Sequence, residues 1–96
     1  MLTDLPAPRV GPFFERVQAV AAAVEAACGA QGTFVAINNR VSQSIAHLHV
    51  HVVPRTKGDG LRGFFWPRHP YASDEAARGV AARIRGAAER LREAPA

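Results

Sequence analysis

The sequence contains a single cysteine, Cys28, among its 96 residues. This excludes an intrachain disulfide and any metal site built on paired cysteines, so we predict a reducing, cytoplasmic location. Long apolar stretches are also missing, because no run approaches the ~20 residues that a membrane-spanning helix needs. The residues that follow Met1, Leu-Thr-Asp-Leu-Pro, form neither the basic nor the apolar region of a signal peptide. We therefore expect neither export nor a membrane partner.

Lysine is scarce as well, since only Lys57 among the 12 basic residues is a lysine, and the formal net charge is +4. The arginines are scattered along an alanine-rich chain, whereas nucleic-acid-binding domains cluster their basic residues in a patch. We attribute the arginines to biased composition and predict no nucleic-acid partner. With 48% hydrophobic and 21% charged residues, the chain has the composition of one small globular domain.

Apolar spacing predicts two helices. Residues 13–28 carry an apolar stripe at three- and four-residue spacing, with Gly29 as a C-cap. Residues 2–12, which contain three prolines, indicate an irregular lead-in. A second helix is expected over residues 74–92, with Ser73 as its N-cap, acidic residues in its first turn and arginines in its last.

Two strands are expected between the helices. Residues 33–38 and 44–53 have strand-forming sequences, residues 39–42 form a tight connection, and Pro54 closes the second strand, so we predict an antiparallel hairpin. The predicted fold class is α+β, with a long helix before the hairpin and a helix after it. A two-stranded hairpin alone is only marginally stable. Either a second chain completes the sheet, or part of the domain is missing from its N-terminus.

Three of the four histidines, His47, His49 and His51, fall within five residues. Successive side chains of a strand point to opposite faces, so these three imidazoles should share one face. The other face would carry Leu48, Val50 and Val52.

Two interpretations of this row involve no substrate. Adjacent imidazoles can share a zinc ion, but His47 and His51 are ~13–14 Å apart along an extended strand, which disfavours a site built on all three. The remaining histidine, His69, falls in a predicted loop. A purely structural row would need a separate hydrogen-bond partner for every buried imidazole. We predict no metal site, and keep a metal-binding protein as an alternative.

The third interpretation is chemistry on a phosphate group. A neutral imidazole is a nucleophile and a protonated one is an acid. A row with ~7 Å between neighbours can follow successive groups of an extended polyphosphate. Neutral donors that can hold phosphate oxygens flank the row in the predicted hairpin. They are Gln43 and Ser44 on the histidine strand, and Asn38 and Asn39 at the end of its partner.

The chain resembles the histidine triad (HIT) superfamily of nucleotide hydrolases and transferases, whose signature alternates three histidines with hydrophobic residues. Here the signature is met by His47-Leu48-His49-Val50-His51-Val52-Val53. The resemblance covers most of residues 2–60. It also includes Leu2-Thr3-Asp4-Leu5-Pro6, Gln43-Ser44-Ile45-Ala46, Pro54-Arg55 and Gly58-Asp59-Gly60.

The resemblance implies a role for each histidine. His49 would attack the α-phosphate and form a covalent nucleotidyl-histidine, which water then hydrolyses. His51 would bind phosphate and help the leaving group depart. His47 would orient the site, partly through its backbone carbonyl, which would hold the other ring nitrogen of His49. The implied function is a nucleotide hydrolase or nucleotidyl transferase that acts on a phosphoanhydride or phosphoramidate of a nucleotide or dinucleotide, without a cofactor.

The resemblance also assigns the polar neighbours. Gln43 and Ser44 would bind phosphate oxygens or assist the leaving group. Asn38 would match the family's polar residue that closes the preceding strand, with Asn39 as the alternative because the turn here is short.

Besides this shorter turn, two further departures from the family pattern stand out. The aromatic segment 60–68 resembles that of a bacterial subgroup, and we interpret it as a structural anchor, with stacking of Trp66 on a base and phosphate contacts from Arg62 or Arg68 as the alternative. The family also has strands before the Leu-Thr-Asp-Leu-Pro point that line the base and ribose pocket. We therefore expect residues 1–96 to form a single, N-terminally shortened HIT-like domain.

This shortening keeps a second function open, that of a catalytically weak or inactive nucleotide-binding module. Relatives pair through the long helix and a strand edge. The resemblance therefore implies a homodimer with residues 13–28 in its interface.

Overall fold

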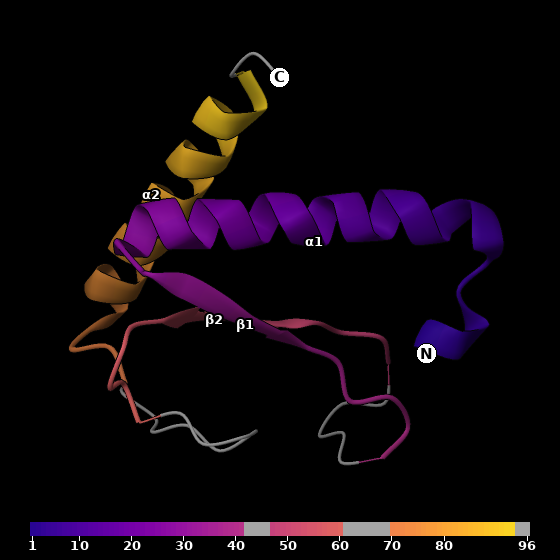
Figure 1. Cartoon of the computed structure of the whole chain (residues 1–96). Helices are drawn as coiled ribbons and strands as arrows, with labels where there is room; N and C mark the ends of the chain where they lie inside the picture. The colour runs from indigo at the N-terminus through magenta and orange to yellow at the C-terminus, as the bar shows by residue number, and fades with distance from the viewer. Residues whose placement is uncertain (42–46, 61–69, 94–96) are drawn as a thin grey trace.

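The computed structural model describes residues 1–41, 47–60 and 70–93. In chain order, these residues form a short 3₁₀ helix, a long helix α1, the strands β1 and β2, and a second long helix α2 (Figure 1). This arrangement confirms the predicted α+β class. The bounds of the five elements are Leu2–Asp4, Ala7–Cys28 (α1), Gly32–Ala36 (β1), His51–Arg55 (β2) and Asp74–Glu93 (α2).

Helix α1 begins at Ala7, so the prediction of an irregular segment over residues 2–12 was wrong for its second half. Pro8 lies in the first helical turn, where a missing N–H is no loss and a fixed φ favours the helix. Pro12 lies inside the helix and removes one backbone hydrogen bond. At the other end the predicted C-cap is confirmed, because Gly29 adopts the left-handed conformation with φ 60°.

The two strands form the predicted antiparallel hairpin, with Gly32 opposite Arg55 and Ala36 opposite His51. Both strands differ from the predicted ranges. β1 stops at Ala36, short of the asparagines, and β2 therefore begins only at the last histidine of the row. β2 also continues through Pro54 instead of ending before it. Proline is tolerated there because β2 pairs on only one side within the described residues.

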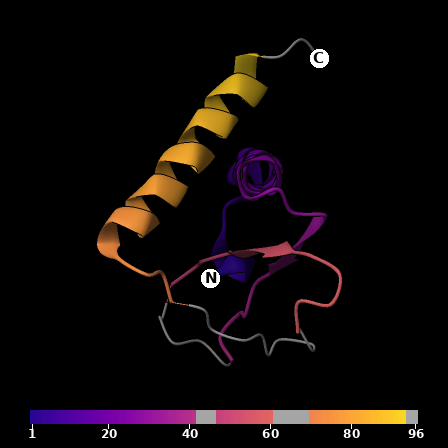
Figure 2. The same ribbon diagram turned by 90° about the vertical axis from the view of Figure 1, so that its left-hand side faces the viewer.

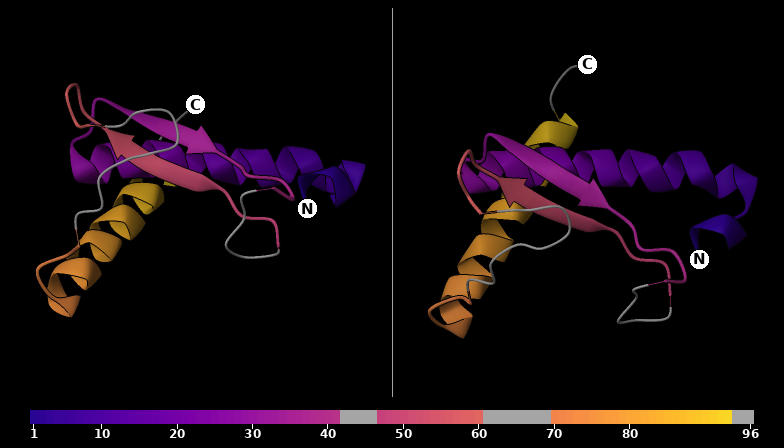
Figure 3. Two further views of the ribbon diagram at one scale, coloured as in Figure 1. Left: turned by 90° about the horizontal axis from the view of Figure 1, so that it is seen from below. Right: turned by 60° about the horizontal axis from the view of Figure 1, so that its bottom comes forward.

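Helix α1 lies over one face of the hairpin, and α2 crosses the C-terminal part of α1 (Figures 1 and 2). Figure 2 shows α1 end-on, between α2 and the hairpin. Among the described residues, the buried ones are small: Ala23 and Val24 of α1, and Ala87 of α2. Seen from below, the two strands lie side by side, and no described helix covers the face of the hairpin that is turned away from α1 (Figure 3).

Helix α2 has the predicted N-cap. The hydroxyl oxygen of Ser73 accepts the backbone N–H of Ala76 at 3.0 Å, which satisfies one of the free donors of the first turn. Neither α1 nor α2 is long and apolar enough to cross a membrane, a finding that covers the described residues.

Candidate functional site

The hairpin has two ends of different composition. The pairing of Ala36 with His51 brings residues 37–41 and 47–50 together, and we call this the histidine end. The pairing of Gly32 with Arg55 marks the opposite end, which leads into residues 56–60, and we call this the far end.

At the histidine end the three imidazoles form a row. The ring centroids of His47 and His49 are 6.2 Å apart, and those of His49 and His51 are 5.1 Å apart. Only His51 belongs to the strand, so the prediction that all three histidines lie within β2 was wrong, although the row itself is present. His47 is exposed, and the other two are half-buried. Within the described residues, no group of three or more metal-ligating side chains has the geometry of a metal site.

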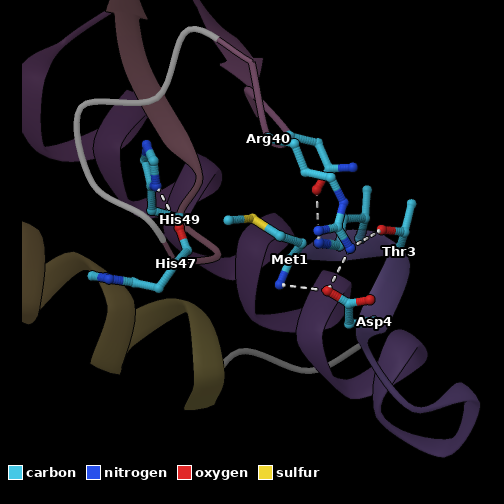
Figure 4. Close-up of polar contacts among 8 residues, drawn as sticks. Met1, Thr3, Asp4, Arg40, His47 and His49 are labelled. Atoms are coloured by element: carbon cyan, nitrogen blue, oxygen red, sulfur yellow. Dashed lines mark hydrogen bonds and ion pairs between the residues drawn. The ribbon is translucent and has the colours of Figure 1, made fainter.

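The middle histidine is held by the backbone of the first. Nδ1 of His49 lies 2.9 Å from the carbonyl oxygen of His47. A carbonyl oxygen can only accept a hydrogen bond, so Nδ1 carries the proton in this contact. In a neutral imidazole the other nitrogen, Nε2, then has its lone pair available. Figure 4 shows this contact between His47 and His49.

The asparagines lie at the same end. The side-chain oxygen Oδ1 of Asn39 accepts the backbone N–H of Leu2 at 3.0 Å. This contact fixes which way the amide faces, so Nδ2 of Asn39 is left as a donor on its other side. Asn38 is half-buried. The remaining predicted residues lie outside the described residues: Gln43, Ser44, Arg62, Trp66, Arg68 and His69.

Sequence reasoning did not predict any role for Arg40 at the histidine end. Its Nη2 donates to Oδ2 of Asp4 at 2.7 Å and to Oγ1 of Thr3 at 3.2 Å (Figure 4). Its backbone has φ 71°, the left-handed region that non-glycine residues rarely adopt. The unusual φ is a property of the folded chain, and the partners are 36 and 37 residues away, so no local pattern in the sequence indicates them.

The far end is closed by a similar ion pair. Nε and Nη2 of Arg55 donate to the two carboxylate oxygens of Asp59 at 2.7 and 3.1 Å. The same carboxylate accepts the backbone N–H of Thr56 at 3.0 Å. The hydrogen bonds to Asp59 raise the pKa of Arg55 above its ordinary value, while partial desolvation opposes the shift. The guanidinium therefore stays charged at all physiological pH values.

Two open grooves flank the contact between α1 and α2, and neither includes a histidine. The larger, of about 890 Å³, is lined by Val20, Leu91 and alanines together with the polar residues Arg16, Gln18, Arg85 and Glu89. The smaller, of about 340 Å³, is lined by alanines, Gly86 and Arg90, among others. The two grooves are thus separate from the histidine end of the hairpin.

The comparisons with known proteins agree with this arrangement. The family model described as the HIT domain matches residues 1–58, which include α1, the hairpin and the complete histidine row. No curated protein and no solved structure matches the chain. The matched residues cover more than half of the chain and form a partial domain, with α2 outside the match. The chain therefore belongs to the HIT domain family.

Proposed function

We propose that this protein is a nucleotide hydrolase or nucleotidyl transferase that works through a covalent nucleotidyl-histidine on His49. The substrate is a phosphoanhydride or phosphoramidate of a nucleotide. Nε2 of His49 attacks the α-phosphorus, a P–N bond forms, and the bond from phosphorus to the leaving group breaks. Water or another acceptor then attacks the same phosphorus, and the P–N bond to His49 breaks.

The contact between His47 and His49 carries this proposal. A nucleophilic imidazole needs an unprotonated nitrogen, and the hydrogen bond from Nδ1 to the carbonyl of His47 supplies one at Nε2. The contact also fixes the ring orientation before substrate arrives, which lowers the entropic cost of reaching the reactive geometry. The role of His47 is therefore exerted through its backbone.

His51 is the proposed partner for the leaving group. Its ring centroid lies 5.1 Å from that of His49, a distance that allows both imidazoles to contact groups on the same phosphorus. A protonated His51 can donate to the leaving oxygen or nitrogen as the bond to phosphorus breaks. Asn38 or Asn39, together with Gln43 and Ser44, supplies neutral donors for the phosphate oxygens.

The covalent step gives the decisive experiment. The protein is incubated with a nucleoside 5′-phosphoramidate labelled at the α-phosphorus, quenched in base because phosphohistidine is acid-labile, and examined for label on the chain. We expect label on the native chain and none on the His49→Ala variant. The matched control is His47→Ala, which keeps the backbone carbonyl and should still be labelled. Turnover by purified His49→Ala protein would refute the proposal.

A nucleotide-binding module without turnover is the second candidate. The HIT domain match is to a partial domain, which supports this second candidate. Calorimetric titration with a nucleoside monophosphate, run beside a hydrolysis assay, separates the two. Binding without product over hours supports the module, and product formation supports the enzyme.

A homodimer paired through α1, and a cytoplasmic location, complete the proposed function. The exposed side chains of Phe14 and Val20 on α1 support the first of these. Light scattering at micromolar concentration tests it, and a monomeric mass contradicts it.

A further inference from the structure

Arg40 occupies a backbone conformation that needs an explanation. It is the only described non-glycine residue with a positive φ, at 71°. A left-handed conformation is strained for a residue with a Cβ atom, and glycine would adopt it without strain. Strained residues persist where surrounding contacts over-determine them, and they concentrate at functional sites. The side chain of Arg40 should therefore have a function that glycine cannot supply.

The contacts of Arg40 show what its side chain holds. The guanidinium binds Thr3 and Asp4, and the neighbouring Asn39 accepts the backbone N–H of Leu2. These contacts join the 3₁₀ turn at the start of the chain to the turn that follows β1. We call them the N-terminal latch.

The latch lies at the histidine end of the hairpin. Residues 37–40 leave β1 where Ala36 pairs with His51, so the turn that carries Arg40 starts beside the histidine row. In the view of Figure 4, Met1 lies between the latch and the two histidines His47 and His49. The Met1 side chain is only 15% exposed, so it is packed rather than projecting into solvent.

We infer that Arg40 is a positioning residue, which uses the N-terminal latch to hold the histidine end in its reactive geometry. By holding the N-terminal turn it orients Asn39, whose Oδ1 accepts the Leu2 N–H so that Nδ2 faces away from Leu2 as a donor. Through residues 37–40 it braces the end of the hairpin where Ala36 pairs with His51. The expected loss of activity rests on the proposed function. The expected change in the placement of His47 and His49 rests on the structure alone.

The energetics of the latch favour positioning over stabilisation. Both side chains of the ion pair are more than half exposed, with Arg40 at 55% and Asp4 at 60%. Exposed ion pairs contribute little to stability because water and salt screen them. The pair therefore adds little to the folding equilibrium, whereas the contacts of Arg40 with Thr3 and Asp4 join the turn after β1 to the 3₁₀ helix and restrict where these two segments lie.

The test compares two substitutions at one position. Arg40→Ala removes the guanidinium contacts of the latch and keeps the backbone strain, whereas Arg40→Gly removes the same contacts and relieves the strain. We expect the melting temperature to be higher for Arg40→Gly than for Arg40→Ala. Both variants should nevertheless show the same displaced amide and ring ¹⁵N resonances at His47 and His49, with the His49 tautomer shifted away from Nδ1–H.

A matched control comes from the far end of the hairpin. Asp59→Asn weakens an Arg–Asp pair with the same 2.7 Å contact, yet it should leave the resonances of His47 and His49 unchanged. Unchanged histidine resonances in both Arg40 variants overturn the inference, whether or not the protein has enzymatic activity.

The kinetic readout separates positioning from folding. With a nucleoside phosphoramidate as substrate, we expect kcat to fall by about tenfold in both Arg40 variants, because small misplacements of reacting groups are costly. KM should change less than kcat. A fall in kcat that follows the melting temperature, large in Arg40→Ala and absent in Arg40→Gly, indicates a merely structural role and contradicts the inference.

Discussion

The two ends of the hairpin are each closed by an arginine and an aspartate, but the pairs differ in reach. At the far end, Arg55 and Asp59 are four residues apart, and two parallel hydrogen bonds join them. At the histidine end, Arg40 and Asp4 are 36 residues apart and share a single contact. The far-end pair closes one loop on itself, whereas the other joins two distant segments. The difference teaches that similar ion pairs can serve local folding at one end and the placement of a reactive group at the other.

The backbone supports this distinction. The far-end loop makes its tight turns with Gly58 and Gly60, at φ 81° and 87°, where a positive φ costs a glycine little. The histidine end places Arg40 in that region instead, at a cost of about 1–3 kcal/mol. An exposed pair such as Arg40 with Asp4 contributes only about 0.2–1 kcal/mol. The turn that carries Arg40 is therefore expected to be less stable than the far-end loop, as strained residues at functional sites are.

After the complete loss expected for His49→Ala, the largest expected effect is also at the histidine end. His51→Ala should lower kcat by about 10²–10⁴-fold, the usual contribution of a general acid or base. His47→Ala should lower kcat much less, because the carbonyl that holds His49 belongs to the backbone and survives the substitution. Steady-state kinetics of the two variants should therefore differ by at least tenfold. Equal losses would show that the His47 side chain, not its carbonyl, does the orienting.

The far end should show the opposite pattern. Asp59→Ala removes both acceptors of Arg55 and the acceptor of the Thr56 N–H, so the loop after β2 loses its closure. We expect a melting temperature lower by several degrees and a kcat within twofold of the native value, because no histidine contact is touched. Thermal melting and steady-state kinetics, measured on one preparation, test this. If Asp59→Ala lowered kcat and left the melting temperature unchanged, the inferred difference between the two ends would be wrong.

Local signals made the fold and the histidine row predictable. The cap residues Ser73 and Gly29 occupy the predicted positions, because a hydroxyl acceptor and a glycine at positive φ each act within one helical turn. The imidazole row follows from the alternation of histidines with aliphatic residues along the chain. It is present although His47 and His49 precede β2. The HIT domain match confirms the family that the histidine run indicated.

Features that depend on distant partners could not be predicted in this way. The latch joins Arg40 to Thr3 and Asp4, and nothing near Arg40 in the sequence indicates either partner. The start of α1 was missed for a different reason, since prolines disfavour a helix interior but suit its first turn. Which of the two applies depends on where the helix begins, and residues 2–12 alone do not decide this.

The smallest expected effect concerns charge at the far end and is visible only in alkali. The hydrogen bonds that Asp59 accepts raise the pKa of Arg55, so the stability that this pair contributes is present below the unfolded-state pKa of arginine and is lost only above the still higher folded-state value. Arg55→Lys keeps the charge at neutral pH but loses the two-pronged contact, so its melting temperature should be slightly lower. Lysine in the unfolded chain has a pKa of about 10.4, and its contribution disappears as pH rises through its folded-state value. The gap in melting temperature between the native protein and Arg55→Lys should therefore widen only as pH rises above about 10.4, the unfolded-state pKa of lysine. A gap that stays constant would mean that the charge of Arg55 contributes nothing to the far end, and that the fork of hydrogen bonds alone closes the loop.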